Sequence, residues 1–205
     1  MAISLYTSFA INAAYTVLQL GLGMIHSTIW YYSMAAYYFM LSVMRFYLLR
    51  YLRDGHAPGE NKESELRRYR FCGVVLLGMN LALAVIVYYI TWQNRTFVHH
   101  VITTITMAAY TFTSFAMAAI NLIRYRKYQS PVLSAAKAVG FTAAMVSMLT
   151  LETTMLTVFG EGEKGDFDRM MTGTTGAAIT FTVLIMAVYM IVKSTKELKY
   201  IEKEK

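Results

Sequence analysis

One carboxylate stands inside an apolar stretch of this sequence and is the first candidate for chemistry. Glu152 lies in the segment 133–159, where Lys137 is the only other charged residue. Ionisable side chains inside membrane segments are energetically expensive and mark ion or substrate pathways. Glu152 is therefore a candidate transport or proton site. The alternative is a protonated or hydrogen-bonded carboxyl group that packs against Thr153, Thr154 or a partner helix.

Other polar side chains interrupt apolar stretches. Asn80 and Tyr37 join Glu152 as candidate members of the transport site. Arg45 is a candidate contact for an anionic headgroup or substrate, although a long side chain near a helix end more commonly reaches out to the membrane surface. About 15 Å of helix rise separates Arg45 from Glu152, so we expect no direct salt bridge. Four amides are interpreted as hydrogen-bonding links between helices, each contributing about 0.6 kcal/mol, in preference to the alternative that they line a substrate path. They are Asn12, Gln19, Asn80 and Asn121.

Residue patterns for enzymatic or metal chemistry are missing. The chain has no His-Glu-x-x-His, no Gly-x-Ser-x-Gly, no glycine-rich phosphate loop and no paired carboxylates within a span. Its single cysteine, Cys72, excludes an intrachain disulfide and a multi-cysteine metal site. His99 and His100 are read as solvated residues at a membrane surface, although a metal or pH role is conceivable. We expect no enzyme, no cofactor and no resident metal.

The elements that must position these residues follow from the distribution of charge. Hydrophobic residues make up 57% of the 205-residue chain and charged residues 15%, with a mean hydropathy of +0.42. The charge-free runs 1–44, 71–94, 96–123 and 170–192 each exceed the roughly 20 residues that cross a bilayer. We predict an all-α polytopic membrane protein, and no cleavable signal peptide. Residues 1–205 form one six-helix domain without a soluble part, with helices near 3–24, 26–49, 71–92, 98–123, 133–159 and 170–192.

Basic residues predict the orientation of this domain. Sixteen Lys and Arg residues fall on one side of the predicted spans, and only Arg95, Lys164 and Arg169 fall on the other. The positive-inside rule therefore places both termini in the cytoplasm and the protein in the cell membrane. The net charge of +7 reflects this topology and indicates no nucleic-acid partner. The expected partners are the lipid bilayer and anionic headgroups at the cytoplasmic face, and the protein could also be a homo-oligomer.

A short motif recurs three times. Met34-Ala-Ala-Tyr-Tyr-Phe-Met40 is echoed by Met107-Ala-Ala-Tyr-Thr-Phe-Thr113, and the latter by Gly176-Ala-Ala-Ile-Thr-Phe-Thr182. Successive copies share five of seven residues. The pattern indicates either three repeated two-helix hairpins, as in many transporters, or convergence of Ala-rich helices.

A set of motifs in order along the chain resembles the cation diffusion facilitator family. The first lies in the opening helices, at Asn12, Gln19, Gly23 and Thr28. Three more are Glu65-Leu-Arg-Arg-Tyr-Arg70, Ile123-Arg-Tyr-Arg-Lys-Tyr-Gln-Ser-Pro-Val-Leu133 and Tyr189-Met-Ile-Val-Lys-Ser-Thr-Lys-Glu-Leu198. The resemblance covers nearly the whole chain. It implies a bundle of six helices with both termini in the cytoplasm.

The same resemblance argues against zinc as the substrate. The family builds its zinc site from Asp and His pairs four residues apart on the second and fifth helices. Those positions here hold Tyr37 and Leu41, then Val139 and Ala143, and the family's cytoplasmic metal-binding domain has no counterpart. One phenol and three aliphatic side chains cannot supply the roughly four donors that zinc requires.

Two functions remain open from the sequence. The first is a secondary transporter of a small solute or ion, with a polar path near Glu152 and without competence for zinc. The second is a transporter-like scaffold that acts as a partner subunit or a lipid-binding protein and moves nothing. The two differ in whether Glu152 faces a hydrated cavity or a sealed helix contact.

Overall fold

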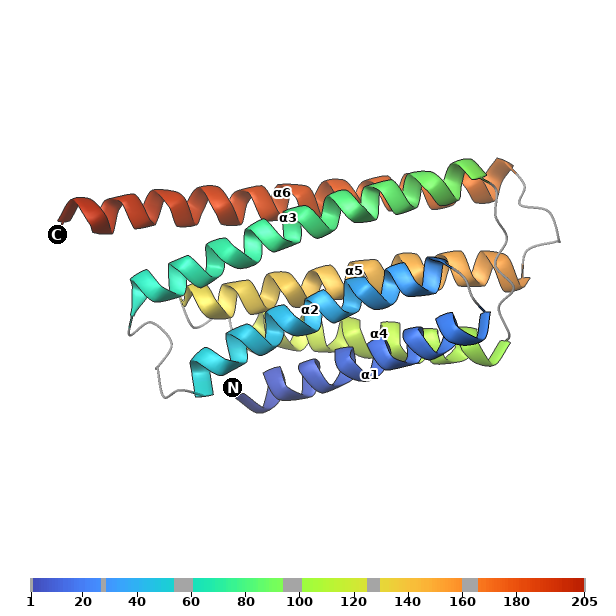
Figure 1. Ribbon diagram of the computed structural model, residues 1–205, viewed down its shortest axis with the longest axis horizontal. Coiled ribbons are helices and arrows are strands. Elements are labelled where there is room, and N and C mark those ends of the chain that lie inside the picture. Colours follow the sequence, from blue (N-terminus) through green and yellow to red (C-terminus); the bar gives the residue numbers. More distant parts are fainter. Residues whose placement is uncertain are drawn as a thin grey trace.

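A computed structural model describes residues 2–26, 29–53, 61–93, 101–124, 130–159 and 166–204. These described residues form six α-helices and no strand, which confirms the all-α prediction. The helices are α1 (Ala2–His26), α2 (Ile29–Arg53), α3 (Lys62–Gln93), α4 (Val101–Arg124), α5 (Pro131–Phe159) and α6 (Asp166–Glu204). They lie along one long axis, and both ends of the chain lie at the same end of the bundle (Figure 1).

Only part of the six-span prediction is confirmed. Among the described residues, three helices are long and apolar enough to cross a membrane, not six: Lys62–Tyr88, Pro131–Leu156 and Phe167–Lys203. The shortfall lies in α1, α2 and α4, which contain many Tyr, Thr, Ser and amide residues. Averaged over their full lengths, α1 and α4 are nevertheless more apolar than α3 and α6.

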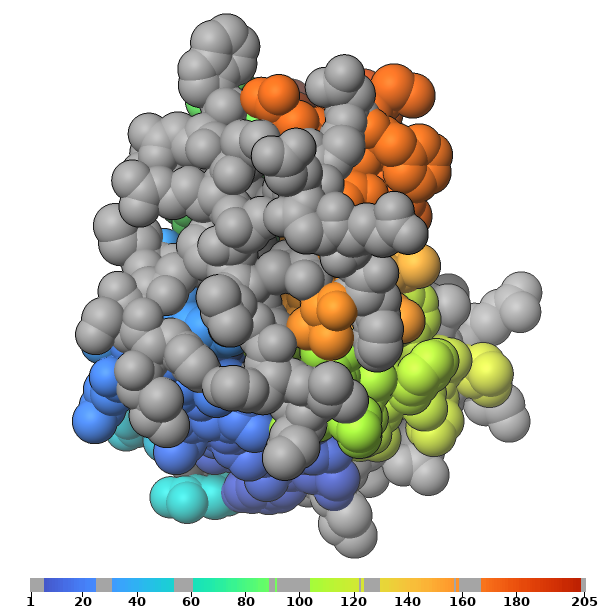
Figure 2. Space-filling view, turned by 90° about the vertical axis from the view of Figure 1, so that its right-hand side faces the viewer, coloured from blue at the N-terminus to red at the C-terminus, as the bar shows by residue number. Residues whose placement is uncertain are grey.

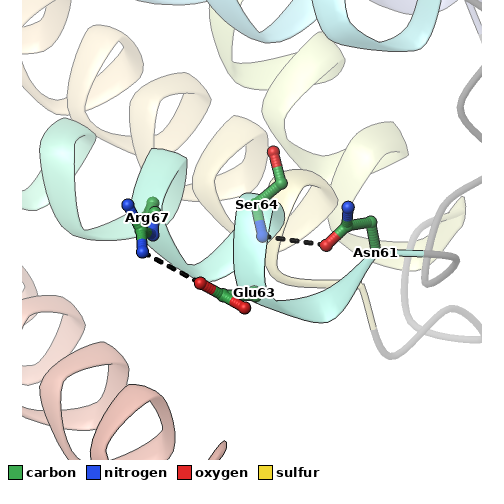
Figure 3. A network of polar contacts seen from close by, with 4 residues as sticks. All are labelled: Asn61, Glu63, Ser64 and Arg67. Atoms are coloured by element: carbon green, nitrogen blue, oxygen red, sulfur yellow. Dashed lines mark hydrogen bonds and ion pairs between the residues drawn. The ribbon is translucent and has the colours of Figure 1, made fainter. Parts of the chain in front are cut away.

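Helix α3 begins at Lys62, well before the expected Phe71, because a polar cap starts it there. The Asn61 side-chain oxygen accepts a hydrogen bond from the Ser64 backbone N–H at 3.2 Å, which satisfies a donor that the first turn leaves open (Figure 3). Glu63 pairs with Arg67 one turn later at 2.9 Å. Acidic residues in a first turn also interact favourably with the helix dipole. The charged segment before Phe71 is therefore part of the helix.

The helices pack as two groups that share α5. Helix α3 runs along α6, while α1 lies along α2 and α4 along α5. Helix α5 also contacts α2, α3 and α6, so it joins the two groups. Figure 2, viewed along the axis from the end opposite the termini, shows α1 and α2 beside α4, with the start of α6 above. The three hairpins suggested by the recurring motif do not recur as packed pairs, because α3 pairs with α6 and α4 with α5.

Small residues let α3 and α6 approach closely. A Cβ atom added to Gly176 of α6 would lie 2.5 Å from Val87 Cγ1 of α3, and one added to Gly73 of α3 would lie 3.1 Å from Met190 Cβ. Asn80 also donates a hydrogen bond from Nδ2 to the Thr180 carbonyl at 3.0 Å. The two helices are therefore held by close backbone approach together with a polar link.

Candidate functional site

Helix α1 presents a buried polar face. Its members recur at helical spacing and are each at most 5% exposed: Ser8, Asn12, Tyr15, Thr16 and Gln19. This face meets α4. Asn12 Oδ1 accepts a hydrogen bond from the Tyr110 hydroxyl at 2.9 Å, and Ser8 Oγ accepts one from Asn121 Nδ2 at 3.5 Å. The seam between α1 and α4 is thus polar along three turns of helix, inside a bundle whose outer residues are largely apolar.

Three tyrosine rings close the seam from three helices. Tyr15 of α1 stacks on Tyr110 of α4 with ring centroids 3.6 Å apart. Tyr38 of α2 meets the edges of both rings, at 4.7 Å from Tyr15 and 5.5 Å from Tyr110. These rings, with Asn12 and Gln19, form what we call the tyrosine–amide site. Its walls are aromatic, and its polar atoms are hydroxyl and amide groups.

Helix α5 supports this site through two threonines. The Thr150 hydroxyl donates to the Met34 sulfur at 3.7 Å, and the Thr154 hydroxyl donates to the Met107 sulfur at 3.1 Å. Met34 and Met107 begin the first two copies of the recurring motif, and Tyr38 and Tyr110 lie within those copies. The first methionine of each of these two copies thus contacts a threonine on successive turns of α5.

Several polar atoms of the site have no hydrogen-bond partner among the described residues. Gln19 is 0% exposed, and neither of its amide atoms is in hydrogen-bond geometry, although its side chain lies near the Tyr15 hydroxyl. The hydroxyl oxygens of Tyr15 and Tyr38 are also outside hydrogen-bond geometry, although the Tyr38 hydroxyl lies near Thr150. A buried polar group left in this state costs about 1–3 kcal/mol. The site therefore offers donors and acceptors to a polar guest.

Arg45 is buried inside the bundle. It is 6% exposed, so its side chain packs in the interior and does not extend outward from the helices as expected. A Cβ atom added to Gly140 of α5 would lie 3.6 Å from Arg45 Nη2, so the missing side chain at Gly140 makes room for the guanidinium group. Arg45 also interacts electrostatically with Tyr110. It thus places a positive charge near the tyrosine–amide site.

The predicted site residues are not brought together. Tyr37 is buried next to Tyr38, with ring centroids 6.2 Å apart, so it borders the tyrosine–amide site. Asn80 links α3 to α6 and acts as the helix contact that the amides were expected to make. Glu152 lies half-buried beside Thr175 of α6. Thr150 faces α2, and two residues along an α-helix turn the side chain by about 200°, so Glu152 is on another face of α5.

The separation of Arg45 from Glu152 is confirmed. Arg45 approaches α5 at Gly140, and twelve residues from there to Glu152 correspond to about 18 Å of helix. The two ion pairs in the described part of the chain are elsewhere, at Glu63 with Arg67 and at Lys193 with Glu197. His99 and His100 lie outside the described residues.

The positions that resemble the zinc site of cation diffusion facilitators are all buried in the core. Tyr37 is 5% exposed, and Leu41, Val139 and Ala143 are at most 1% exposed. Among the described residues, no three His, Cys, Asp or Glu side chains cluster in a way that could hold a metal ion. Zinc would find one phenol and three aliphatic groups there, which is a poor donor set.

Comparisons with models of protein families and with curated proteins find no match for this chain. The comparisons therefore do not link the chain to cation diffusion facilitators, and that resemblance rests on the sequence motifs alone.

Two features of the interior were not predicted from the sequence. Tyr15, Tyr38 and Tyr110 were not chosen as site residues, although the polar spacing in α1 and the tyrosines in the recurring motif pointed to them. Glu65 was placed before a helix, whereas it is 0% exposed in α3 and accepts a hydrogen bond from the Ser130 hydroxyl at 2.5 Å. An N-cap reading of Asn61 would have placed Glu65 within the helix.

Proposed function

We propose that all six helices cross the membrane. The other three helices, α1, α2 and α4, also carry large apolar side chains on their exposed faces, including Val17, Leu20, Phe39, Val43, Phe46, Ile105, Phe112 and Ile120. Many of their polar residues are buried, among them Asn12, Gln19, Tyr38 and Thr111. A helix on the surface of a water-soluble protein has the opposite arrangement, with its apolar face toward the core. The outward apolar faces support lipid as the surrounding medium.

We further propose that both termini are cytoplasmic. The two chain ends lie at the same end of the bundle, as an even number of spans requires (Figure 1). The described basic residues of segments 45–70 and 124–137 and of the C-terminal part of α6 belong to that end, and the positive-inside rule assigns it to the cytoplasm. Labelling single cysteines placed between α3 and α4 and after α6, in a Cys72→Ser background, tests this. A C-terminal cysteine labelled from outside intact cells would contradict it.

The function that the geometry supports best is binding and transport of a small polar solute by a secondary transporter. The observation that carries this proposal is the tyrosine–amide site, in which buried amide and hydroxyl atoms lack partners in the described chain. Ligand sites in helical bundles are formed by side chains of facing helices around a few polar groups. Arg45 favours a solute with an anionic group, because a guanidinium group pairs well with carboxylate or phosphate.

Zinc is not the proposed substrate, because the positions that resemble a zinc site supply too few donors. Glu152 keeps a separate role in the proposal. It lies on the α5 face toward α6, away from the tyrosine–amide site, where it could couple transport to protons without touching the solute. Replacing Glu152 by Gln would then remove the dependence of transport on a pH gradient while leaving solute binding intact.

A thermal-shift screen tests the proposal. Purified protein in detergent is heated with monocarboxylates, amino acids, nucleosides, inorganic phosphate and zinc, and the melting temperature is recorded. We expect a polar solute to raise the melting temperature of the wild type and of Asn80→Leu, but not of Gln19→Leu. The matched control, Asn80→Leu, removes an amide outside the site.

The solute found is then tested for flux into proteoliposomes. Binding and flux that Gln19→Leu abolishes support transport through the tyrosine–amide site. A melting temperature that no solute changes, together with no flux, would favour the non-transporting scaffold. A shift that Gln19→Leu retains would place the site elsewhere.

A further inference from the structure

A cavity of about 460 Å³ lies between α4, α5 and α6, apart from the tyrosine–amide site. Helix α5 contributes Ser134, Lys137 and Phe141 to its lining, α4 contributes Phe115, and α6 contributes Met186. Phe115 is 38% exposed and Phe141 is 41% exposed, so the cavity opens at the side of the bundle. Its volume is within the range of about 300–1,000 Å³ that is typical of ligand sites. We call it the α5 groove.

The lining of the α5 groove changes from polar to apolar along α5. Ser134 and Lys137 lie near the first turns, and Phe141 and Ala144 follow on the same side of the helix. From Lys137 to Ala144 the helix rises about 10 Å. The polar part is at the end of the bundle that holds both termini (Figure 1). A guest with a polar head and an apolar tail would fit in this direction.

Lys137 supplies the charge that selects the head. Its side chain is half-buried in the groove. The acidic residues that form ion pairs in the described ranges, Glu63 and Glu197, pair with Arg67 and Lys193 and leave Lys137 without a carboxylate. A half-buried ammonium group is stabilised by an anion at hydrogen-bond distance.

We propose that the α5 groove binds an anionic glycerophospholipid. One acyl chain lies along Phe141, Ala144 and Met186, and the phosphate group pairs with Lys137. The lateral opening gives access from the bilayer, and the position of Lys137 matches the leaflet on the proposed cytoplasmic side. The site is independent of solute transport, because none of its lining residues belongs to the tyrosine–amide site.

Lipid retention tests the proposal. Wild-type protein is reconstituted in vesicles of phosphatidylglycerol and phosphatidylcholine and extracted into detergent, and the retained lipid classes are quantified by mass spectrometry. We expect phosphatidylglycerol to be enriched over phosphatidylcholine. Lys137→Gln should lower this enrichment about fivefold, which is the effect of one basic residue at an anionic membrane surface. Lys137→Arg should keep it.

Two further variants separate the groove from general surface charge. Lys193→Gln removes an exposed lysine of α6 that pairs with Glu197, and it should leave the enrichment unchanged. Ala144→Phe should fill the groove and reduce retention of both lipid classes, while the melting temperature shows that the variant is folded. An equal loss in Lys137→Gln and Lys193→Gln, equal retention of both lipids by the wild type, or a groove that retains only detergent would overturn the proposal.

Discussion

The α3–α6 pair and the four-helix part made of α1, α2, α4 and α5 have similar apolar outer surfaces but different interiors. Between α3 and α6, glycines at 73 and 176 bring the helices into close contact. Between α1 and α4, stacked tyrosines and amides occupy the interface. A close backbone contact leaves no room for a guest, whereas an interface of polar side chains can exchange partners. The difference supports the proposal that the α3–α6 pair stabilises the bundle and that the solute site lies in the four-helix part.

We expect the largest effect on stability from breaking the hydrogen bond that links α5 to α3. Ser130 at the start of α5 donates a hydrogen bond to the buried Glu65 of α3. Ser130→Ala should lower the free energy of unfolding by about 1.5–3 kcal/mol, the range for hydrogen bonds to charged groups. Chemical denaturation in detergent measures this. Ser134→Ala, one turn later, is the control and should change stability by less than about 0.5 kcal/mol. Equal effects would show that the link is not important.

The next largest effect on stability is expected from a larger side chain at the close contact between α3 and α6. Gly176→Ala places a Cβ atom against Val87 and should destabilise the protein by about 1–3 kcal/mol, as overpacking does. Gly78→Ala on α3 is the control, because nothing lies within 4 Å of its added Cβ atom. That control should be neutral or stabilising by up to about 1 kcal/mol, because Ala is the better helix former. The melting temperatures should move in opposite directions.

A second change on the partner helix sharpens this test. Val87→Ala removes the methyl groups that the new Cβ atom would meet. The double variant of Gly176→Ala and Val87→Ala should therefore be more stable than the sum of the single effects implies. Strict additivity of the two changes would contradict direct contact at this position.

In the four-helix part, hydroxyl groups with and without partners can be compared directly. Tyr110→Phe removes the hydroxyl that bonds to Asn12 and should cost about 1 kcal/mol. Tyr37→Phe removes a buried hydroxyl that has no partner among the described residues, and stability should not fall. Unfolding in detergent measures both. A larger loss of stability for Tyr37→Phe than for Tyr110→Phe would contradict this assignment of hydrogen-bond partners.

The smallest effect compares two buried amides. Asn80→Leu removes the bond to the Thr180 carbonyl and should cost about 0.6 kcal/mol, the average for polar contacts between membrane helices. Gln19→Leu removes an amide without a hydrogen-bond partner and should leave stability unchanged or raise it. A clear loss of stability in Gln19→Leu without any solute would mean that the amide serves packing and not a ligand.

The number and order of helices could be predicted from the sequence because charge-free runs reveal long apolar segments directly. The helix ends were harder to place. Helix α3 extends back to Lys62 through charged residues, since a cap at Asn61 and a Glu63–Arg67 pair support a helix that hydropathy does not detect. Average hydropathy also cannot distinguish a polar residue that faces the bundle interior from one that faces lipid.

The site was predicted only in part, because spacing within one helix does not determine which helix lies opposite. Asn12 and Gln19 were noted from the sequence as amide links between helices, and Tyr37, chosen as a candidate transport-site residue, is buried beside Tyr38. Tyr15 and Tyr110 could be recognised as their neighbours only once the fold placed α1 against α4. Asn12 and Tyr110, which form a hydrogen bond, are 98 residues apart in the sequence. Glu152 was chosen for its charge alone, and the fold turns it toward a different helix.

The pairing of α3 with α6 constrains how the chain can be synthesised. Asn80 and Thr180 are 100 residues apart, and ribosomes add about 5–20 residues per second. Helix α3 is therefore made about 5–20 s before the helix that covers Gly73 and receives its amide bond. During that interval α4 and α5 emerge, and α5 can dock on α3 first. The α3–α6 contact therefore forms last, because α6 is the last helix to be made.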